Sequence, residues 1–171
     1  MKIIKLTLIA AIIIAPFITS AQSQFDKFED MDGVSSVIVN QRAFSLMAQI
    51  GAESDDEYLD LIKNIKSLRV FATEEDAASN KMEAEVTTYL KTAKLEELMR
   101  VNDDGNNVKI YVKEGKNEEY VKELFMFVKS KDEQTVVVLL TGDINLTQIS
   151  KLTAKMNIPG GEHLDKATTK K

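Results

Sequence analysis

Residues 135–152 constrain the fold of this chain more than any other stretch. Val136 to Leu140 form one of the two longest unbroken apolar runs outside the N-terminus, and Gly142 follows it before helical spacing begins at Leu146. Its β-branched beginning and the glycine break favour a buried strand that ends near Gly142. The stretch therefore predicts the centre of a sheet, followed directly by a helix.

Three further predicted strands lead into this one. An Asp-Gly pair at 104–105 separates the β-rich runs 98–101 and 108–113, which is a strong hairpin signal. A second turn is expected over 115–119. Residues 120–129 would also suit a helix, but we interpret them as a strand because their phenylalanines and valine favour β structure. A four-strand antiparallel meander results.

Helical spacing and capping residues dominate the rest of the chain. After a strand at 34–39, one helix should run to Gly51, and a second should begin at the capping-box spacing 54–57. A third, over 75–93, should follow the strand 67–73 and a second capping signature at Thr73-Glu-Glu-Asp76. The last helix should begin at Asn145 as its N-cap. The expected inner positions are Ala43, Phe44, Met47 and Ile50; Tyr58, Leu61, Ile62 and Ile65; Ala78, Met82, Val86, Tyr89, Leu90 and Ala93; and Leu146, Ile149, Leu152 and Met156.

This element order predicts an α+β fold. We expect a two-layer sandwich in which about six mainly antiparallel strands carry helices on one face. Residues 34–160 should form a single domain, preceded by a linker or short helix over 22–33. The lysine-rich residues 161–171 should form a disordered polar tail.

The first 21 residues predict a signal peptide. Lys2 and Lys5 precede an apolar stretch, and the small residues 19–21 suit cleavage after Ala21. The apolar stretch is shorter than a membrane span requires, and Pro16 interrupts it. We therefore expect an exported protein, periplasmic or secreted, with no transmembrane span after cleavage. Since the chain has no cysteine, a lipoprotein is excluded by sequence.

Charge and cysteine content exclude several classes of function. The formal net charge is −5, and it becomes −7 if the two lysines leave with the signal peptide. An acidic chain lacks the basic excess that binding to nucleic acid or to an anionic membrane requires. The absence of cysteine excludes thiolate and redox chemistry, and it requires a fold that is stable without disulfides.

Several segments resemble the family catalogued as domain of unknown function 4252. They are Phe25-Asp-Lys-Phe28 with Met31-Asp-Gly-Val-Ser-Ser-Val37, Glu97-Leu-Met-Arg-Val101 with Asp103-Asp-Gly105, Val108-Lys-Ile-Tyr-Val-Lys113, and Leu140-Thr-Gly-Asp-Ile-Asn-Leu146. The resemblance implies an exported Bacteroidetes protein of unknown activity, with a possible link to extracytoplasmic sigma-factor systems. Many members look like lipoproteins with a cysteine at the processing site, which this chain lacks.

No metal or cofactor site is predicted. The acidic residues Asp26, Glu29, Asp30 and Asp32 precede Gly33, but placing Gly33 sixth in a calcium loop puts Phe28 first and Val39 twelfth, where oxygen ligands are needed. Gly105 fails the same test. His163, the single histidine, falls in the predicted tail, and Gly142 has no partner glycines at phosphate-loop spacing.

Two candidate sites remain. Asp143 follows the central strand and could serve a carboxylate hydrolase, as could the acidic pairs at 55–56 and 103–104, although capping by Asp143 or Asn145 explains these polar residues more simply. A possible interaction surface lies at Leu124, Phe125, Met126, Phe127 and Val128, whose two-sided apolar character exceeds what one buried face needs. A helix packed over the second face would explain that character equally well.

The sequence predicts a binding protein and not an enzyme. Without a catalytic constellation, we expect an exported envelope protein that binds a protein or an envelope component, with a possible regulatory role. The alternatives are a hydrolase that works through Asp143 and a self-associating structural envelope protein.

Overall fold

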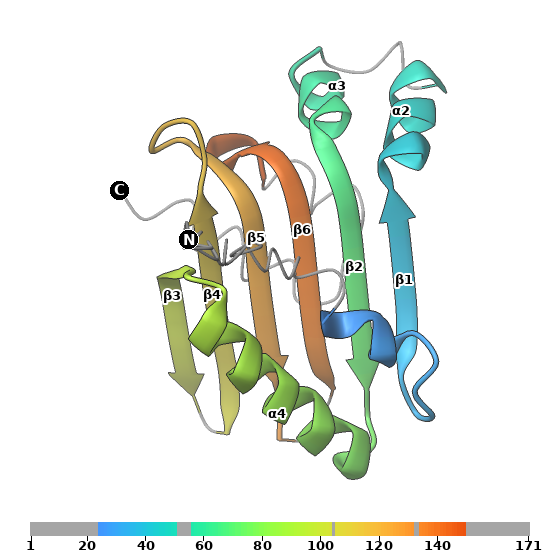
Figure 1. The fold of residues 1–171 in the computed structure, drawn as a ribbon, viewed down its shortest axis with the longest axis vertical. Coiled ribbons are helices and arrows are strands. Elements are labelled where there is room, and N and C mark those ends of the chain that lie inside the picture. Colours follow the sequence, from blue (N-terminus) through green and yellow to red (C-terminus); the bar gives the residue numbers. More distant parts are fainter. Residues whose placement is uncertain (1–23, 51–55, 104, 132–133, 150–171) are drawn as a thin grey trace, which may run out of the picture.

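The computed structural model describes residues 24–50, 56–103, 105–131 and 134–149. They build one six-stranded sheet in which every neighbouring pair of strands is antiparallel, in the order β1-β2-β6-β5-β4-β3 (Figure 1). The strands are β1 (Ser35–Asn40), β2 (Ile65–Thr73), β3 (Glu96–Asp103), β4 (Asn106–Glu114), β5 (Tyr120–Lys129) and β6 (Thr135–Asn145). The predicted α+β class and the C-terminal meander are confirmed.

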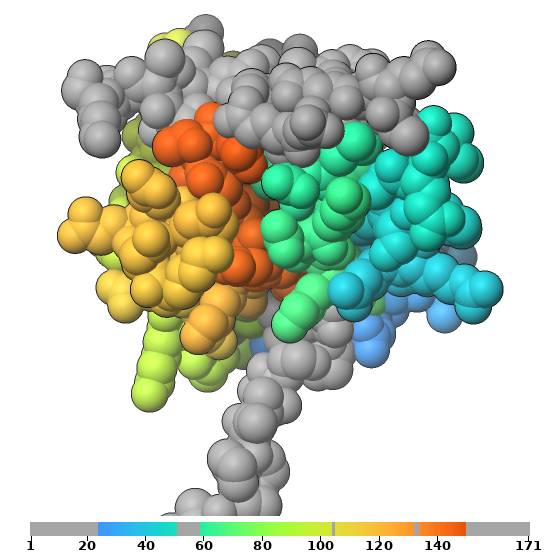
Figure 2. All heavy atoms as spheres, turned by 90° about the horizontal axis from the view of Figure 1, so that it is seen from above, coloured from blue at the N-terminus to red at the C-terminus, as the bar shows by residue number. Residues whose placement is uncertain are grey.

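Helices occur on both faces of this sheet. They are η1 (Asp26–Phe28), α2 (Gln41–Ile50), α3 (Asp56–Lys63), α4 (Asp76–Thr92) and η2 (Leu146–Gln148). Figure 1 shows α4 and η1 in front of the strands, whereas α2 and α3 lie beyond one end of β1 and β2. Figure 2 shows α2 and α3 side by side, on the opposite side of the molecule from the turn between β4 and β5.

Two apolar clusters sandwich the sheet. The cluster under α4 includes Phe71, Phe125 and Val137, together with Met82 and Val86 of the helix itself. The second cluster lies on the other face and contains buried residues of α2, α3 and the four inner strands, and Val39 of β1 and Met99 and Val101 of β3 pack against it. The prediction that helices pack on one face thus holds for α4 and η1, whereas the buried residues of α2 and α3 belong to the cluster on the other face. Alternation along the strands explains this, because both sets of alternate residues are apolar.

Strand β6 continues past the glycine that was expected to end it. It extends to Asn145, and Gly142 lies opposite Ile65 at an irregularity of the β2–β6 register. The backbone N–H of Asp143 donates to the carbonyl of Asn64 at 3.0 Å. Gly142 thus marks a close approach of two chain segments and not a strand end, which is a common role of glycine inside a strand.

The predicted cap is confirmed at the start of η2 but not at the start of α4. Asn145 is confirmed as an N-cap, since its side-chain oxygen accepts from the backbone N–H of Thr147 at 2.9 Å. The N-cap of α4 is Glu75, whose side chain makes no capping bond, and not Thr73. The Thr73 hydroxyl instead accepts from the Glu75 backbone N–H and donates to the carbonyl of Gly33 at 2.6 Å.

Residues 24–33 belong to the folded unit. Phe25 and Phe28 are fully buried, and their rings contact Tyr89, Phe125 and Phe71. The predicted signal peptide, the caps at 51–55, the continuation of the last helix through Leu152 and Met156, and the polar tail lie outside the described residues. None of the helices within the described ranges is long and apolar enough to cross a membrane.

Candidate functional site

The strand expected to carry an interaction surface is in the core. β5 lies between β4 and β6, and four of the five predicted surface residues, Leu124 to Phe127, are buried. Leu124 and Met126 belong to one apolar cluster, while Phe125 and Phe127 belong to the other. Val128 is half-buried. The two-sided apolar character therefore reflects a central strand covered on both faces, and the surface expected at Leu124–Val128 is not present.

Exposed apolar side chains gather instead on β1 and on the helix that follows it. Val37 and Ile38 of β1 are 55% and 46% exposed, and Ile50 at the end of α2 is 86% exposed. Leu46 and Met47 of α2 are exposed as well. We call these five residues the β1–α2 edge. Both elements lie at the same lateral margin of the described molecule in Figures 1 and 2.

Helix α2 buries a narrower stripe than its sequence suggested. Phe44 and Ala48 are its buried residues, whereas Met47 and Ile50, both expected inside, are exposed. The reason is position, because β1 is an edge strand and α2 extends from its end, so that among the described elements the helix is in contact mainly with α3, β2 and β1. The predicted inner position of Phe44 is confirmed, whereas the inner positions predicted for Met47 and Ile50 are wrong.

The two edges of the sheet differ in chemistry. β3 at one edge carries Glu96, Glu97, Arg100 and Asp103, and charged edge strands resist pairing with other chains. No charged residue and no proline lies between Asp32 and Arg42, the stretch that contains β1 at the other edge. The β1 edge thus combines exposed apolar side chains with an unprotected strand backbone.

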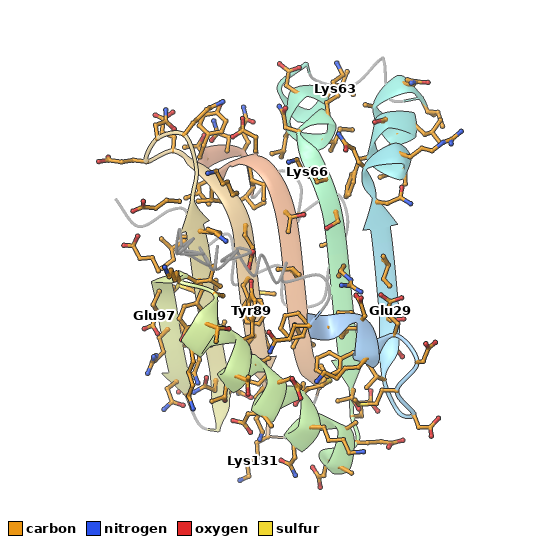
Figure 3. All side chains as sticks on the ribbon, in the orientation of Figure 1. Glu29, Lys63, Lys66, Tyr89, Glu97 and Lys131 are labelled. Carbon is orange, nitrogen blue, oxygen red and sulfur yellow. The ribbon has the colours of Figure 1, made fainter. Side chains whose placement is uncertain are left out.

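Two of the acidic residues before Gly33 form ion pairs with a buried arginine. Arg69 of β2 has a side chain only 5% exposed, and its guanidinium bonds the carboxylates of Asp26 (2.7 Å) and Glu29. The same guanidinium lies 5.5 Å from the ring centroid of Phe71. Figure 3 shows Glu29 beside β2, at the level of η1. This contact fixes the N-terminal segment to the sheet and provides an alternative to calcium binding.

A second buried polar contact joins α4 to β5. The Tyr89 hydroxyl donates to a carboxylate oxygen of Glu123, and both residues are buried. Burial raises the pKa of the Glu123 carboxyl, and the Tyr89 hydrogen bond and the Lys113 charge oppose that rise. Burial also raises the pKa of the Tyr89 hydroxyl, with a further contribution from Glu123. In Figure 3, Tyr89 extends from α4 toward the sheet.

Asp143 is paired with a surface lysine. Its carboxylate lies 2.9 Å from the Lys116 ammonium, and its side chain is 46% exposed. A depression of about 400 Å³ among the described residues is lined by other residues, Lys94, Leu95, Glu96, Val112, Lys113 and Glu114. Among the described residues, the structure thus gives Asp143 a surface ion pair with Lys116.

Most of the remaining acid and histidine candidates lie outside the described residues. Asp103 is exposed at the end of β3, while Asp55, Asp104 and His163 lie outside the described residues. Within the described part of the chain, no group of three or more histidine, aspartate and glutamate side chains could hold a metal ion.

Sequence reasoning missed the β1–α2 edge although a signal was present. Val37, Ile38 and Val39 are consecutive apolar residues in a strand, so one of them had to face away from any single buried layer. Leu46 likewise lay outside the expected stripe of α2. The Arg69 contact was invisible, because its partners lie 40 or more residues away in the sequence.

Comparison with known proteins gives one match. A family model described as Domain of unknown function (DUF4252) matches residues 28–152, a span that contains the whole sheet. No curated protein and no solved structure matches the chain.

Proposed function

We propose, from the premise that this chain belongs to the DUF4252 family, that it is an exported, non-catalytic module that binds another polypeptide through the β1–α2 edge. Export rests on the charged and apolar N-terminal sequence. The absence of catalysis rests on the sequence, which offers no nucleophile–base or metal-ligand pattern. A regulatory role in the envelope remains an expectation from the family resemblance.

The observation that carries this proposal is the exposure of five large apolar side chains at one edge. Scattered exposed apolar residues are normal on proteins, whereas a group of them marks a binding surface. Full burial of a valine, leucine or isoleucine contributes roughly 1.5–3 kcal/mol. Covering Leu46, Met47 and Ile50, which are 50%, 39% and 86% exposed, would therefore contribute several kcal/mol to binding.

The backbone of β1 supports the same choice of surface. An edge strand presents unpaired N–H and C=O groups to which an extended peptide can add. Main-chain bonds would give a partner affinity, while Val37 and Ile38 would contact its side chains on opposite faces of the sheet. A polypeptide suits this combination because it can contact a strand backbone and exposed apolar side chains at the same time.

Site-specific photo-crosslinking tests the proposal. A photoreactive amino acid replaces Leu46 or Ile50 in the protein expressed in its own cells, and Leu98 serves as the matched control. Leu98 is exposed at 41%, but it lies on the charged edge strand β3. We expect defined crosslinked protein bands from positions 46 and 50 and none from position 98.

The identity of the crosslinked partner does not affect this test. A band that contains a second copy of the chain and a band that contains a different protein both support a polypeptide-binding edge. Equal crosslinking from Leu98, or no band from either edge position at native expression, would contradict the proposal.

A further inference from the structure

We propose that the contact between Glu123 and Tyr89 is a pH-operated latch for the second half of α4. When the Glu123 carboxyl is protonated, it stays buried against Tyr89. When it is ionised, it turns to the ammonium of Lys113 and releases the helix. The latch lies on the central strand β5, so the inference goes beyond the polypeptide-binding edge and does not depend on it.

The first step is that one carboxyl has two partners within reach. Glu123 is only 6% exposed and accepts a hydrogen bond from the Tyr89 hydroxyl. It also lies directly opposite Lys113 in the β4–β5 register. Opposite residues of an antiparallel pair point to the same face, with their Cβ atoms roughly 4.5–5.5 Å apart. Since Lys113 is exposed, one partner holds the carboxyl under α4 and the other leads it to the surface.

The second step is the charge around the carboxyl. On the β6 side, Glu123 faces Thr141, whose hydroxyl does not titrate in this range. Other ionisable groups on this face of the sheet are engaged elsewhere: Tyr111 donates to Glu97, and Arg69 bonds Asp26 and Glu29. Among the described residues, the Tyr89 hydrogen bond and the Lys113 charge favour the ionised carboxyl, and burial opposes ionisation.

The third step is the difference between the two positions in their affinity for a proton. Burial raises the pKa of the Glu123 carboxyl above the ordinary 4.5, so the position against Tyr89 favours protonation. Beside Lys113 the carboxylate would be hydrated and would face a positive charge. Rising pH must therefore shift the population from the first position to the second. Release is rarest below the ordinary pKa and increases as pH passes through the raised pKa.

The fourth step is that the two halves of α4 are attached separately. Polar contacts hold the first half: Ser79 Oγ lies 2.7 Å from Thr135 Oγ1, and Glu83 pairs with Lys129 at 2.6 Å. In the second half, the Tyr89 ring lies 5.1 Å from the ring centroid of Phe25 and 5.3 Å from that of Phe125. Loss of the latch should therefore loosen the second half together with Phe25, while the first half stays in place.

Thiol labelling at two positions of α4 tests the latch, because the full chain has no cysteine of its own. Val86→Cys reports on the second half and Ser79→Cys on the first, and both residues are buried. A pyridyl disulfide, which reacts with thiols in acid and in neutral solution, is added to the folded protein between pH 4 and pH 8. Each cysteine is compared with the same cysteine in the Glu123→Gln background, so that the titration of the thiol cancels.

The expected result is a local response. The ratio of labelling rates with and without the Glu123 carboxyl should rise at least about threefold from pH 4 to pH 8 at Val86→Cys. At Ser79→Cys the ratio should stay constant. Because global unfolding would expose both thiols, the comparison separates release of the second half from loss of the whole fold.

Lysine variants test the second position of the carboxyl. Lys113→Ala should shift the rise at Val86→Cys to higher pH, because the ionised carboxyl loses its partner, whereas Lys113→Arg keeps the charge and should retain the profile. Lys122→Ala removes another exposed lysine of β5 and should also retain it. A constant ratio at Val86→Cys, an equal rise at Ser79→Cys, or a profile unaffected by Lys113→Ala would overturn the inference. The crosslinking test of the β1–α2 edge is independent of all three outcomes.

Discussion

Glu123 is a buried carboxylate, and the hydrogen bond that it accepts from the Tyr89 hydroxyl compensates part of the cost of burial. Removing a carboxylate from water favours its protonated form, which is why its pKa is raised above the ordinary 4.5. Below that ordinary value the carboxyl is neutral in both the folded and the unfolded chain. As pH rises, the unfolded chain ionises first, so stability is lost as pH passes through the raised pKa.

Substitution of Glu123 by glutamine should expose this linkage. The glutamine side chain of Glu123→Gln can still accept a hydrogen bond from the Tyr89 hydroxyl, but it cannot ionise. We therefore expect it to raise the free energy of unfolding relative to the unaltered protein at pH 7, with the difference shrinking as pH falls below 4.5. Urea unfolding between pH 4 and 8 measures this difference.

Glu97 provides a control of opposite sign. A hydrogen bond from Arg100 lowers the pKa of this exposed carboxyl, so its contribution to stability is present above the ordinary pKa and lost as pH falls. Glu97→Gln should give a small loss at pH 7. A Glu123→Gln variant that is less stable at pH 7 than at pH 4, relative to the unaltered protein, would contradict the assignment.

At the scale of elements, β6 depends on a glycine inside the strand. A Cβ added to Gly142 would lie 2.3 Å from the backbone oxygen of Asn64 and 2.9 Å from Cα of Ile65. Neither atom belongs to a flexible side chain, so the backbone between α3 and β2 would have to shift. The close approach lets the chain turn from α3 into β2 beside the central strand.

Gly142→Ala should therefore be strongly destabilising. We expect the free energy of unfolding to fall by about 3 kcal/mol, the upper end for overpacking in a tight site. The neighbouring Asp143→Ala is the matched control, because an exposed ion pair such as Asp143–Lys116 contributes about 0–1 kcal/mol. Denaturant unfolding measures the free energy of unfolding of both variants. Equal losses in the two would show that the fold does not depend on the close approach of Gly142 to Asn64 and Ile65.

At the scale of the whole molecule, the segment before β1 completes the aromatic cluster under α4. Phe25 and Phe28 are fully buried, and Phe25 stacks on Phe125 with 5.7 Å between ring centroids. The described fold thus includes residues 24–33, the segment that was expected to be a linker or short helix. The Arg69 contacts to Asp26 and Glu29 hold this segment in register with β2.

Phe28→Ala should reveal how much this segment stabilises the fold. We expect a loss of about 3–4 kcal/mol in the free energy of unfolding, since a buried phenylalanine ring is removed and a cavity remains. Lys27→Ala removes only a half-exposed ion pair with Glu85 and should change stability by less than about 1 kcal/mol. Thermal or urea unfolding distinguishes the two, and a Phe28→Ala variant as stable as Lys27→Ala would show that the segment only rests on the domain.

The sequence by itself determined the elements that depend on near neighbours in the chain. The hairpin around Gly105, the strand in residues 120–129, the inner stripe of α4 and the Asn145 cap were all predicted, because turn chemistry and side-chain periodicity act over a few residues. The continuation of β6 past Gly142 was not, because its partner at Asn64 and Ile65 is remote in sequence.

The tertiary structure alone decided which apolar strand is buried and which is exposed. Residues 37–39 and 124–128 have the same two-sided apolar character, and no local signal separates them. The sheet order places β5 between β4 and β6, where one apolar cluster covers each of its faces. In the described sheet β1 has a neighbouring strand, β2, on one side only. Strand order is set by long-range pairing and by the burial of whole faces, so the candidate interaction surface moved from Leu124–Val128 to the β1–α2 edge.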